Sequence, residues 1–74
     1  MYDYSKLKGK IVEVYGTQER FAEALGVSRA TLSQKMRGAN MFNQDEIYRT
    51  MLMLKLKNPT PYFFTKKVSQ NDTL

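Results

Sequence analysis

Three glycines divide the first half of the chain into short segments whose apolar residues have helical spacing: Gly16, Gly26 and Gly38. Glycine adopts the left-handed conformation that ends many helices, so each of the three predicts a helix end. Residues 5–15, before the first glycine, place three apolar residues at i, i+4 and i+7: Leu7, Ile11 and Val14. This spacing predicts a helix over Ser5–Tyr15 with one buried face.

The segment between Gly16 and Gly38 predicts two further helices. Thr17 is suited to be the N-cap of a helix over Gln18–Leu25. Ser28 is suited to be the N-cap of a helix over Arg29–Arg37. The residues expected to face inward are apolar at helical spacing: Phe21, Ala22, Leu25, Leu32 and Met36. Two helices joined by a short turn that contains glycine form the helix-turn-helix arrangement.

The second half of the chain predicts two more helices. Asn43 and Glu46 have the spacing of a capping box, with Phe42 and Ile47 as the hydrophobic staple around it. This fourth helix should end near Leu54 or at the following lysine. Asn58 and Pro59 predict the start of a short fifth helix, with Asn58 as N-cap and proline in the first helical position. The predicted fold class is therefore all-α, a compact bundle of about five short helices.

The composition argues against an enzyme and against a metal site. The chain has no cysteine, which excludes a disulfide scaffold and cysteine-ligated metal. It also has no histidine, the commonest general base and metal ligand. The seven carboxylates form no evident inward-facing pair. We expect no cofactor, no metal and no small-molecule substrate.

The charge favours an anionic partner. The formal net charge is +5 at pH 7 and the pI is about 9.6, as is common in small nucleic-acid-binding domains. No apolar run is long enough to span a membrane, because Lys55 and Lys57 interrupt the longest central stretch. The N-terminus lacks the order of a signal peptide. A cytoplasmic protein without a membrane partner is the resulting expectation.

The outward face of the predicted helix after Ser28 has the chemistry of a groove-reading helix. Arginine can bond guanine with two hydrogen bonds, glutamine can do the same with adenine, and small residues allow close approach. Phosphates would repel carboxylates, and residues 28–37 contain none. The outward side chains are short or rich in donors: Ser28, Arg29, Ala30, Ser33, Gln34 and Arg37.

Residues 17–38 resemble the helix-turn-helix of the lambda-repressor-like Cro/repressor superfamily, also called the XRE type. The resemblance is carried by Gln18, Phe21-Ala22, Leu25-Gly26-Val27-Ser28, Thr31-Leu32-Ser33 and the closing Gly38. The chain over residues 4–68 is also similar to short Cro-like proteins from phages of Gram-positive bacteria. These proteins share the sequences found here at Lys8–Val12 and Tyr62–Phe64.

The resemblance implies a role for individual residues. It implies base contacts at the start of the second helix of the pair and one turn later: Ser28, Arg29, Ala30, Ser33 and Gln34. It implies phosphate contacts at the start of the first helix and in the loop after the second: Gln18, Arg37, Gly38 and Asn40. Lys35 and Thr17 are additional phosphate candidates. Arg29 is the first choice for base specificity.

The aromatic residues near the end of the chain predict a subunit contact. A short chain cannot easily bury three neighbouring aromatic side chains, so at least one of Tyr62, Phe63 and Phe64 is expected in a homodimer seam. That dimer could form only on DNA. Two features depart from the family: Phe42 stands where many relatives have tryptophan, and Lys55-Leu56-Lys57 replaces the usual glycine after the fourth helix.

Together these observations predict a DNA-binding domain over residues 1–68 and a disordered tail over 69–74. The expected function is that of a sequence-specific regulator of transcription, a phage Cro-like repressor that binds a double-stranded operator in the bacterial cytoplasm, at the nucleoid. One alternative is a protein-interaction module, an antirepressor or adaptor that kept the fold. Another is an antitoxin-type regulator.

Overall fold

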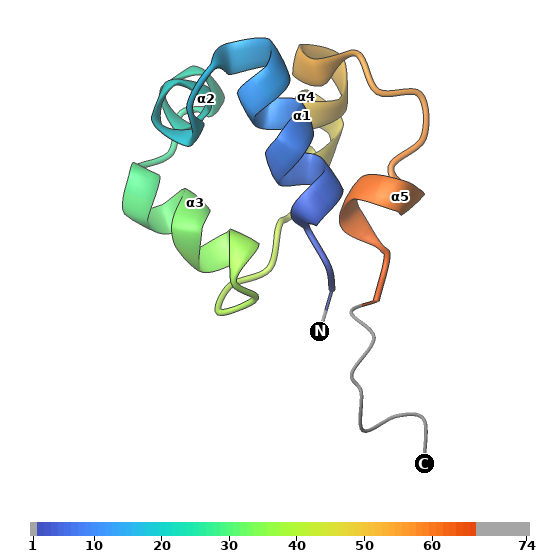
Figure 1. The fold of residues 1–74 in the computed structure, drawn as a ribbon. Coiled ribbons are helices and arrows are strands. Elements are labelled where there is room, and N and C mark those ends of the chain that lie inside the picture. Colours follow the sequence, from blue (N-terminus) through green and yellow to red (C-terminus); the bar gives the residue numbers. More distant parts are fainter. Residues whose placement is uncertain (1, 67–74) are drawn as a thin grey trace.

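A computed structural model describes residues 2–66 of the chain (Figure 1). It contains five helices: α1 Ser5–Tyr15, α2 Gln18–Leu25, α3 Arg29–Met36, α4 Gln44–Leu54 and α5 Thr60–Phe63. Within these residues the only β pairing is an isolated bridge between Tyr2 and Lys66. The predicted all-α class is confirmed. The predicted domain end at residue 68 and the tail over 69–74 lie outside the described residues.

Local side-chain chemistry sets the helix starts where the sequence predicts them. Thr17 Oγ1 accepts a hydrogen bond from Arg20 N at 3.1 Å, which caps α2. The capping box of α4 has both of its bonds, 2.8 Å from Glu46 N to Asn43 Oδ1 and 2.9 Å from Asn43 N to Glu46 Oε1. These bonds satisfy backbone donors that the first turn of a helix leaves without a partner.

Two helix boundaries differ from the prediction. α3 ends at Met36, one residue early, and Arg37 is its C-cap. α5 begins at Thr60, after Pro59, while Asn58 Oδ1 accepts a hydrogen bond from Thr60 N at 3.1 Å. Pro59 is therefore the N-cap, and Asn58, which was predicted to be the N-cap, lies one residue before it.

The core lies between α1, α2, α3 and α4, with α5 closing one end (Figure 1). The largest fully buried side chains are Leu7, Ile11, Phe21, Leu25, Leu32, Thr50, Leu54 and Phe63. Val14, expected on the inner face of α1, is 48% exposed. The prediction for Val14 was wrong because the buried row continues instead to Tyr15, whose ring packs edge-on against Phe21 at 5.4 Å.

Five aromatic rings form a closed circuit beside this core. Successive ring centroids lie 5.2–6.4 Å apart in the order Tyr2, Tyr4, Phe42, Phe63, Phe64 and back to Tyr2. The circuit joins the N-terminal segment to α5 and to the loop before α4, in the tilted and edge-to-face geometries that aromatic pairs favour. Phe42 stands where many relatives have tryptophan. Its place in the circuit makes it a core residue.

The circuit corrects part of the predicted dimer seam. Phe63 is only 1% exposed and packs against Phe42, so it cannot contact a second copy. Tyr62 is half-buried and packs against the core, whereas Phe64 is 46% exposed. Of the three aromatic residues, Phe64 alone leaves much of its ring to solvent. Among residues 2–66, no helix is long and apolar enough to cross a bilayer.

Candidate nucleic-acid interface

The turn between α2 and α3 is built on Gly26. Its φ is 88°, in the left-handed region that favours glycine, and its N–H donates to Ala22 O at 2.9 Å. Val27 N also donates to Ala22 O, at 3.0 Å. The small, buried side chain of Ala22 and the buried Leu25 and Leu32 hold the two helices against the core. Only residues 26–28 separate the helices.

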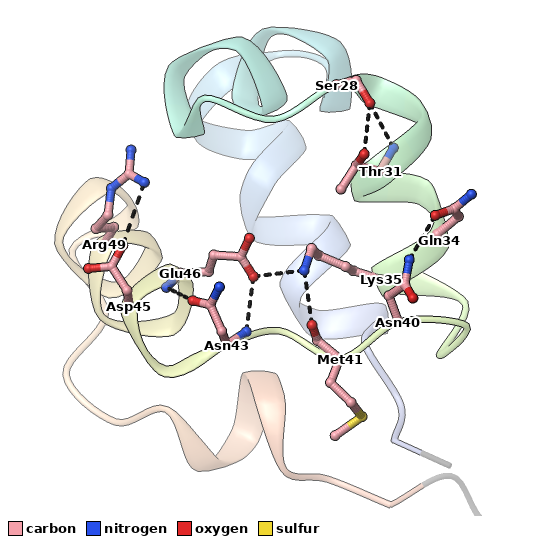
Figure 2. Close-up of polar contacts among 10 residues, drawn as sticks. All are labelled: Ser28, Thr31, Gln34, Lys35, Asn40, Met41, Asn43, Asp45, Glu46 and Arg49. Carbon is pink, nitrogen blue, oxygen red and sulfur yellow. Dashed lines mark hydrogen bonds and ion pairs between the residues drawn. The ribbon is translucent and has the colours of Figure 1, made fainter.

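Ser28 fixes the start of α3. Its Oγ accepts a hydrogen bond from Thr31 N at 3.0 Å and donates one to Thr31 Oγ1 at 2.9 Å (Figure 2). The hydroxyl predicted to contact a base is thus engaged within the chain, although the residue is exposed. The following residues, Arg29 and Ala30, are exposed in the first turn of the helix.

The structure brings the predicted residue of α2 beside those of α3. Gln18, Arg29, Ala30 and Ser33 together line a surface hollow of about 350 Å³. Gln18 and Arg29 also line an adjoining hollow of about 540 Å³, with Val12, Thr17, Glu19 and Arg20. Five of the predicted contact residues therefore share one continuous concave surface. The second hollow also contains an apolar side chain and a carboxylate.

The Gln34 side chain is held by the loop that follows α3. Asn40 Nδ2 donates a hydrogen bond to Gln34 Oε1 at 2.8 Å (Figure 2). An amide oxygen has two lone pairs, so Gln34 keeps one acceptor position and both of its N–H donors for a ligand. Asn40 was predicted as a phosphate contact; its side chain in this structure orients a predicted base contact.

Lys35 does not have the position that a phosphate contact requires. Its Nζ lies 2.9 Å from Glu46 Oε1 and donates to Met41 O at 2.9 Å (Figure 2). The residue is 8% exposed, and the ring of Phe42 lies 5.9 Å from its Nζ. The prediction for Lys35 is corrected accordingly: its charge is paired and buried between α3 and α4, because the side chain turns inward to the carboxylate.

The carboxylate of this pair is kept ionised by its neighbours. Burial raises the pKa of Glu46, but the hydrogen bond from the Asn43 backbone and the ammonium of Lys35 outweigh burial. The pKa of Glu46 therefore lies below its ordinary value. Because Lys35 bonds both Glu46 and the carbonyl of Met41, the ion pair holds the loop between α3 and α4 against α4.

The loop after α3 exposes two of the predicted phosphate contacts. Arg37 and Gly38 are exposed, and Gly38 has a φ of 84°. Arg37 also lines a hollow of about 310 Å³ together with Lys8 of α1. Lys8 here, and Arg20 beside Arg29 in the larger hollow, are cations that were not predicted from the sequence. No pattern within one helix signals these residues, since only the packing of α1 and α2 against α3 brings the cations together.

Comparisons with known proteins cover nearly the whole domain. No curated protein matches the chain. The solution structure of the modulator of repression of the temperate bacteriophage TP901-1 from Lactococcus lactis is similar to it, with 40% sequence identity and a TM-score of 0.69. The match covers 92% of this chain and 95% of that chain. The model of a family of proteins of unknown function, DUF739, matches residues 1–66. The chain therefore belongs to the DUF739 family.

Proposed function

We propose that this chain is a phage regulatory protein that controls repression by binding duplex DNA through the exposed start of α3. The similarity to a phage modulator of repression supports the regulatory role. The observation that carries the DNA-binding proposal is the shared concave surface of Gln18, Arg29, Ala30 and Ser33. It combines the amide of Gln18 on α2 with a guanidinium and two small side chains on α3, a helix without carboxylates.

Each group on this surface has a task in the proposed complex. Arg29 bonds a guanine edge in the major groove, and Gln34, oriented by Asn40, bonds an adenine. Gln18 and the Arg37-Gly38 loop bind phosphates on either side of the groove, which positions α3 without reading sequence. Thr17 caps α2 beside Gln18, so its contribution is to present that helix start. Phosphate neutralisation makes the affinity fall as salt rises.

Replacement of Arg29 tests the proposal. The high-affinity site is first selected from random duplexes, and affinity for that site and for a scrambled duplex is then measured by fluorescence anisotropy. Arg29→Ala should weaken binding to the selected site by about 1–3 kcal/mol and relax the preference at one base pair. Lys57→Ala, which removes an exposed cation outside this surface, is the matched control.

Two results would change the assignment. An equal loss on both duplexes would make Arg29 a phosphate contact instead of a base contact. Absence of binding to any duplex at low salt would refute DNA binding by this surface.

A second candidate function is a protein-directed modulator that acts on a repressor. The name of the TP901-1 relative favours it, and so does the larger hollow, where Val12 is 49% exposed between Arg20, Glu19 and Arg29. Apolar area mixed with both signs of charge is typical of protein interfaces. The burial of Lys35 also leaves fewer cations for phosphates than the sequence indicates.

Binding assays with the phage's own repressor distinguish the two functions. If this candidate is correct, the repressor binds the chain in the absence of DNA, and Arg29→Ala and Val12→Ser both weaken that complex. If DNA binding is the function, Val12→Ser leaves operator affinity nearly unchanged, because it removes apolar area without changing the charge that phosphates meet.

A further inference from the structure

The outer face of α4 carries four exposed residues at i, i+3, i+7 and i+10, here called the α4 row: Asp45, Tyr48, Leu52 and Lys55. Tyr48 and Leu52 are each 61% exposed. The opposite face of the helix supplies the buried Thr50 and Leu54. Neither Tyr48 nor Leu52 belongs to the core or packs against it.

Neither proposed function uses the α4 row. The row lies on a different helix from Arg29 and Gln34, and Figure 2 shows Asp45 on the side of α4 that faces away from α3. Two large apolar side chains one helical turn apart form a stripe on an otherwise polar surface. Contiguous exposed apolar area of this kind marks an interaction surface.

The charges at the two ends of the row identify the partner. The row has an acidic end, two apolar residues and a basic end. When a second copy of the helix is placed beside it in the opposite direction, the acidic end of each copy faces the basic end of the other. Asp45 is three residues before Tyr48, and Lys55 is three residues after Leu52. If two copies of α4 pack antiparallel about a two-fold axis level with Thr50, Tyr48 of each copy meets Leu52 of the other. The same register places Asp45 of each copy opposite Lys55 of the other.

We propose that a second copy of this chain occupies the α4 row, as an antiparallel two-fold pair of α4 helices. An isologous contact requires this kind of self-complementary patch. The charged ends set the register, because a parallel arrangement would bring Asp45 against Asp45 and Lys55 against Lys55. Antiparallel packing also places the opposed helix dipoles side by side.

Asp45 is available for this contact. Its present partner is Arg49, whose Nη1 lies 3.8 Å away, and the Asp45 side chain remains 75% exposed. Arg49 is held elsewhere, because its Nη2 donates to Leu25 O at 2.8 Å across the α2–α4 contact. The carboxylate can therefore pair with a lysine of the second copy while Arg49 keeps its bond to α2.

The size of the row sets the strength of the dimer. One face of a three-turn helix buries less than the roughly 1,000 Å² that stable complexes exceed, so the association should be weak. The dimer is therefore expected to be in concentration-dependent exchange with the monomer. Because the row lies outside the α3 surface, both copies keep that surface free.

The test is sedimentation equilibrium of the full chain without DNA, from about 10 µM to about 1 mM. We expect a monomer–dimer equilibrium that Leu52→Glu weakens at least about tenfold by burying a charge at the seam. Val14→Glu, at an exposed apolar site of α1, is the matched control and should leave the equilibrium unchanged. A monomer throughout this range, or a dimer that Leu52→Glu does not weaken, overturns the proposal.

Charge reversal tests the register independently. Asp45→Lys places like charges together at both ends of the seam and should weaken the dimer about tenfold, since two exposed ion pairs are lost. The double variant Asp45→Lys/Lys55→Asp recreates both pairs with reversed sign and should restore the association. A double variant no tighter than Asp45→Lys overturns the antiparallel register. Circular dichroism of each variant confirms that the helices are retained.

Discussion

The buried ion pair between Lys35 and Glu46 can be tested by removing the acidic charge alone. We predict that Glu46→Gln destabilises the domain, because it leaves the ammonium of Lys35 buried without a counter-charge. The side chains are 10% and 11% exposed, and breaking one partner of a buried pair costs about 3–5 kcal/mol. Lys35 keeps its hydrogen bond to Met41 O, so a loss of about 2–3 kcal/mol is expected.

That loss is large for a domain of this length. At 0.05–0.15 kcal/mol per residue, a chain of 74 residues has a total stability of roughly 4–11 kcal/mol. Thermal unfolding followed by circular dichroism should show Tm lowered by about 10–20 °C. Glutamine can still accept the capping-box bond from Asn43 N, so a large change reports on the charge and not on the cap.

Two further variants make the reasoning refutable. Glu13→Gln breaks the exposed Lys10–Glu13 pair, whose side chains are 32% and 65% exposed, and should cost less than about 1 kcal/mol. Lys35→Met/Glu46→Gln removes both buried charges and should be more stable than Glu46→Gln alone. If Glu46→Gln is no more destabilising than Glu13→Gln, the burial argument is wrong.

The same pair makes stability depend on pH. Burial raises the pKa of Glu46, but the Asn43 backbone and Lys35 together lower it by more than burial raises it. The pKa therefore lies below the ordinary value of 4.5. A carboxylate with a lowered folded-state pKa stabilises the domain fully above the unfolded pKa, and that contribution is lost as pH falls through the folded pKa. The stability gap between the natural chain and Glu46→Gln should therefore shrink below pH 4.5. A gap that stays constant into that acid range would contradict this assignment.

The remaining predictions concern backbone conformation and the core, and both are checked by urea unfolding. Gly26→Ala should destabilise by about 1–2 kcal/mol, because φ there is 88°. Gly9→Ala should stabilise by up to about 1 kcal/mol, because Gly9 is inside α1 and an added Cβ meets nothing within 4 Å. Phe63→Ala should cost about 3–5 kcal/mol at its fully buried site. Phe64→Ala, with the ring 46% exposed, should cost less than half as much; equal losses would contradict the assigned burial.

The sequence was sufficient at three helix starts, where a side chain bonds a residue close to it in the chain. The capping box of Asn43 and Glu46 and the caps at Thr17 and Ser28 have donor and acceptor three residues apart. Their geometry follows from the start of the helix itself, so residue type and spacing predict it. The left-handed turn at Gly26 was predictable for the same reason, since glycine alone reaches this conformation without strain.

One local feature was not signalled by the sequence. α4 ends in a left-handed residue that is not glycine, Lys55, with a φ of 56°. The Lys55 N–H bonds to Leu52 O at 3.3 Å and the Leu56 N–H to Met51 O at 2.8 Å, and Leu56 packs against the core. A residue other than glycine is strained in the left-handed conformation. The packing of Leu56 after the helix offsets that strain at Lys55.

The sequence by itself therefore determined the five helices, most of their boundaries and the carboxylate-free start of α3. Tertiary structure decided which long or aromatic side chains of the candidate site reach solvent. From the sequence, Lys35 was expected to be exposed to solvent, as most lysines are. In the structure its amine instead pairs with the carboxylate of Glu46 on the next helix. Phe63 is buried while the adjacent Phe64 is exposed. The physical reason is that burial depends on how the helices cross. The partner of a flexible cation likewise depends on which groups lie near it in space, and the spacing of residues along one helix specifies neither.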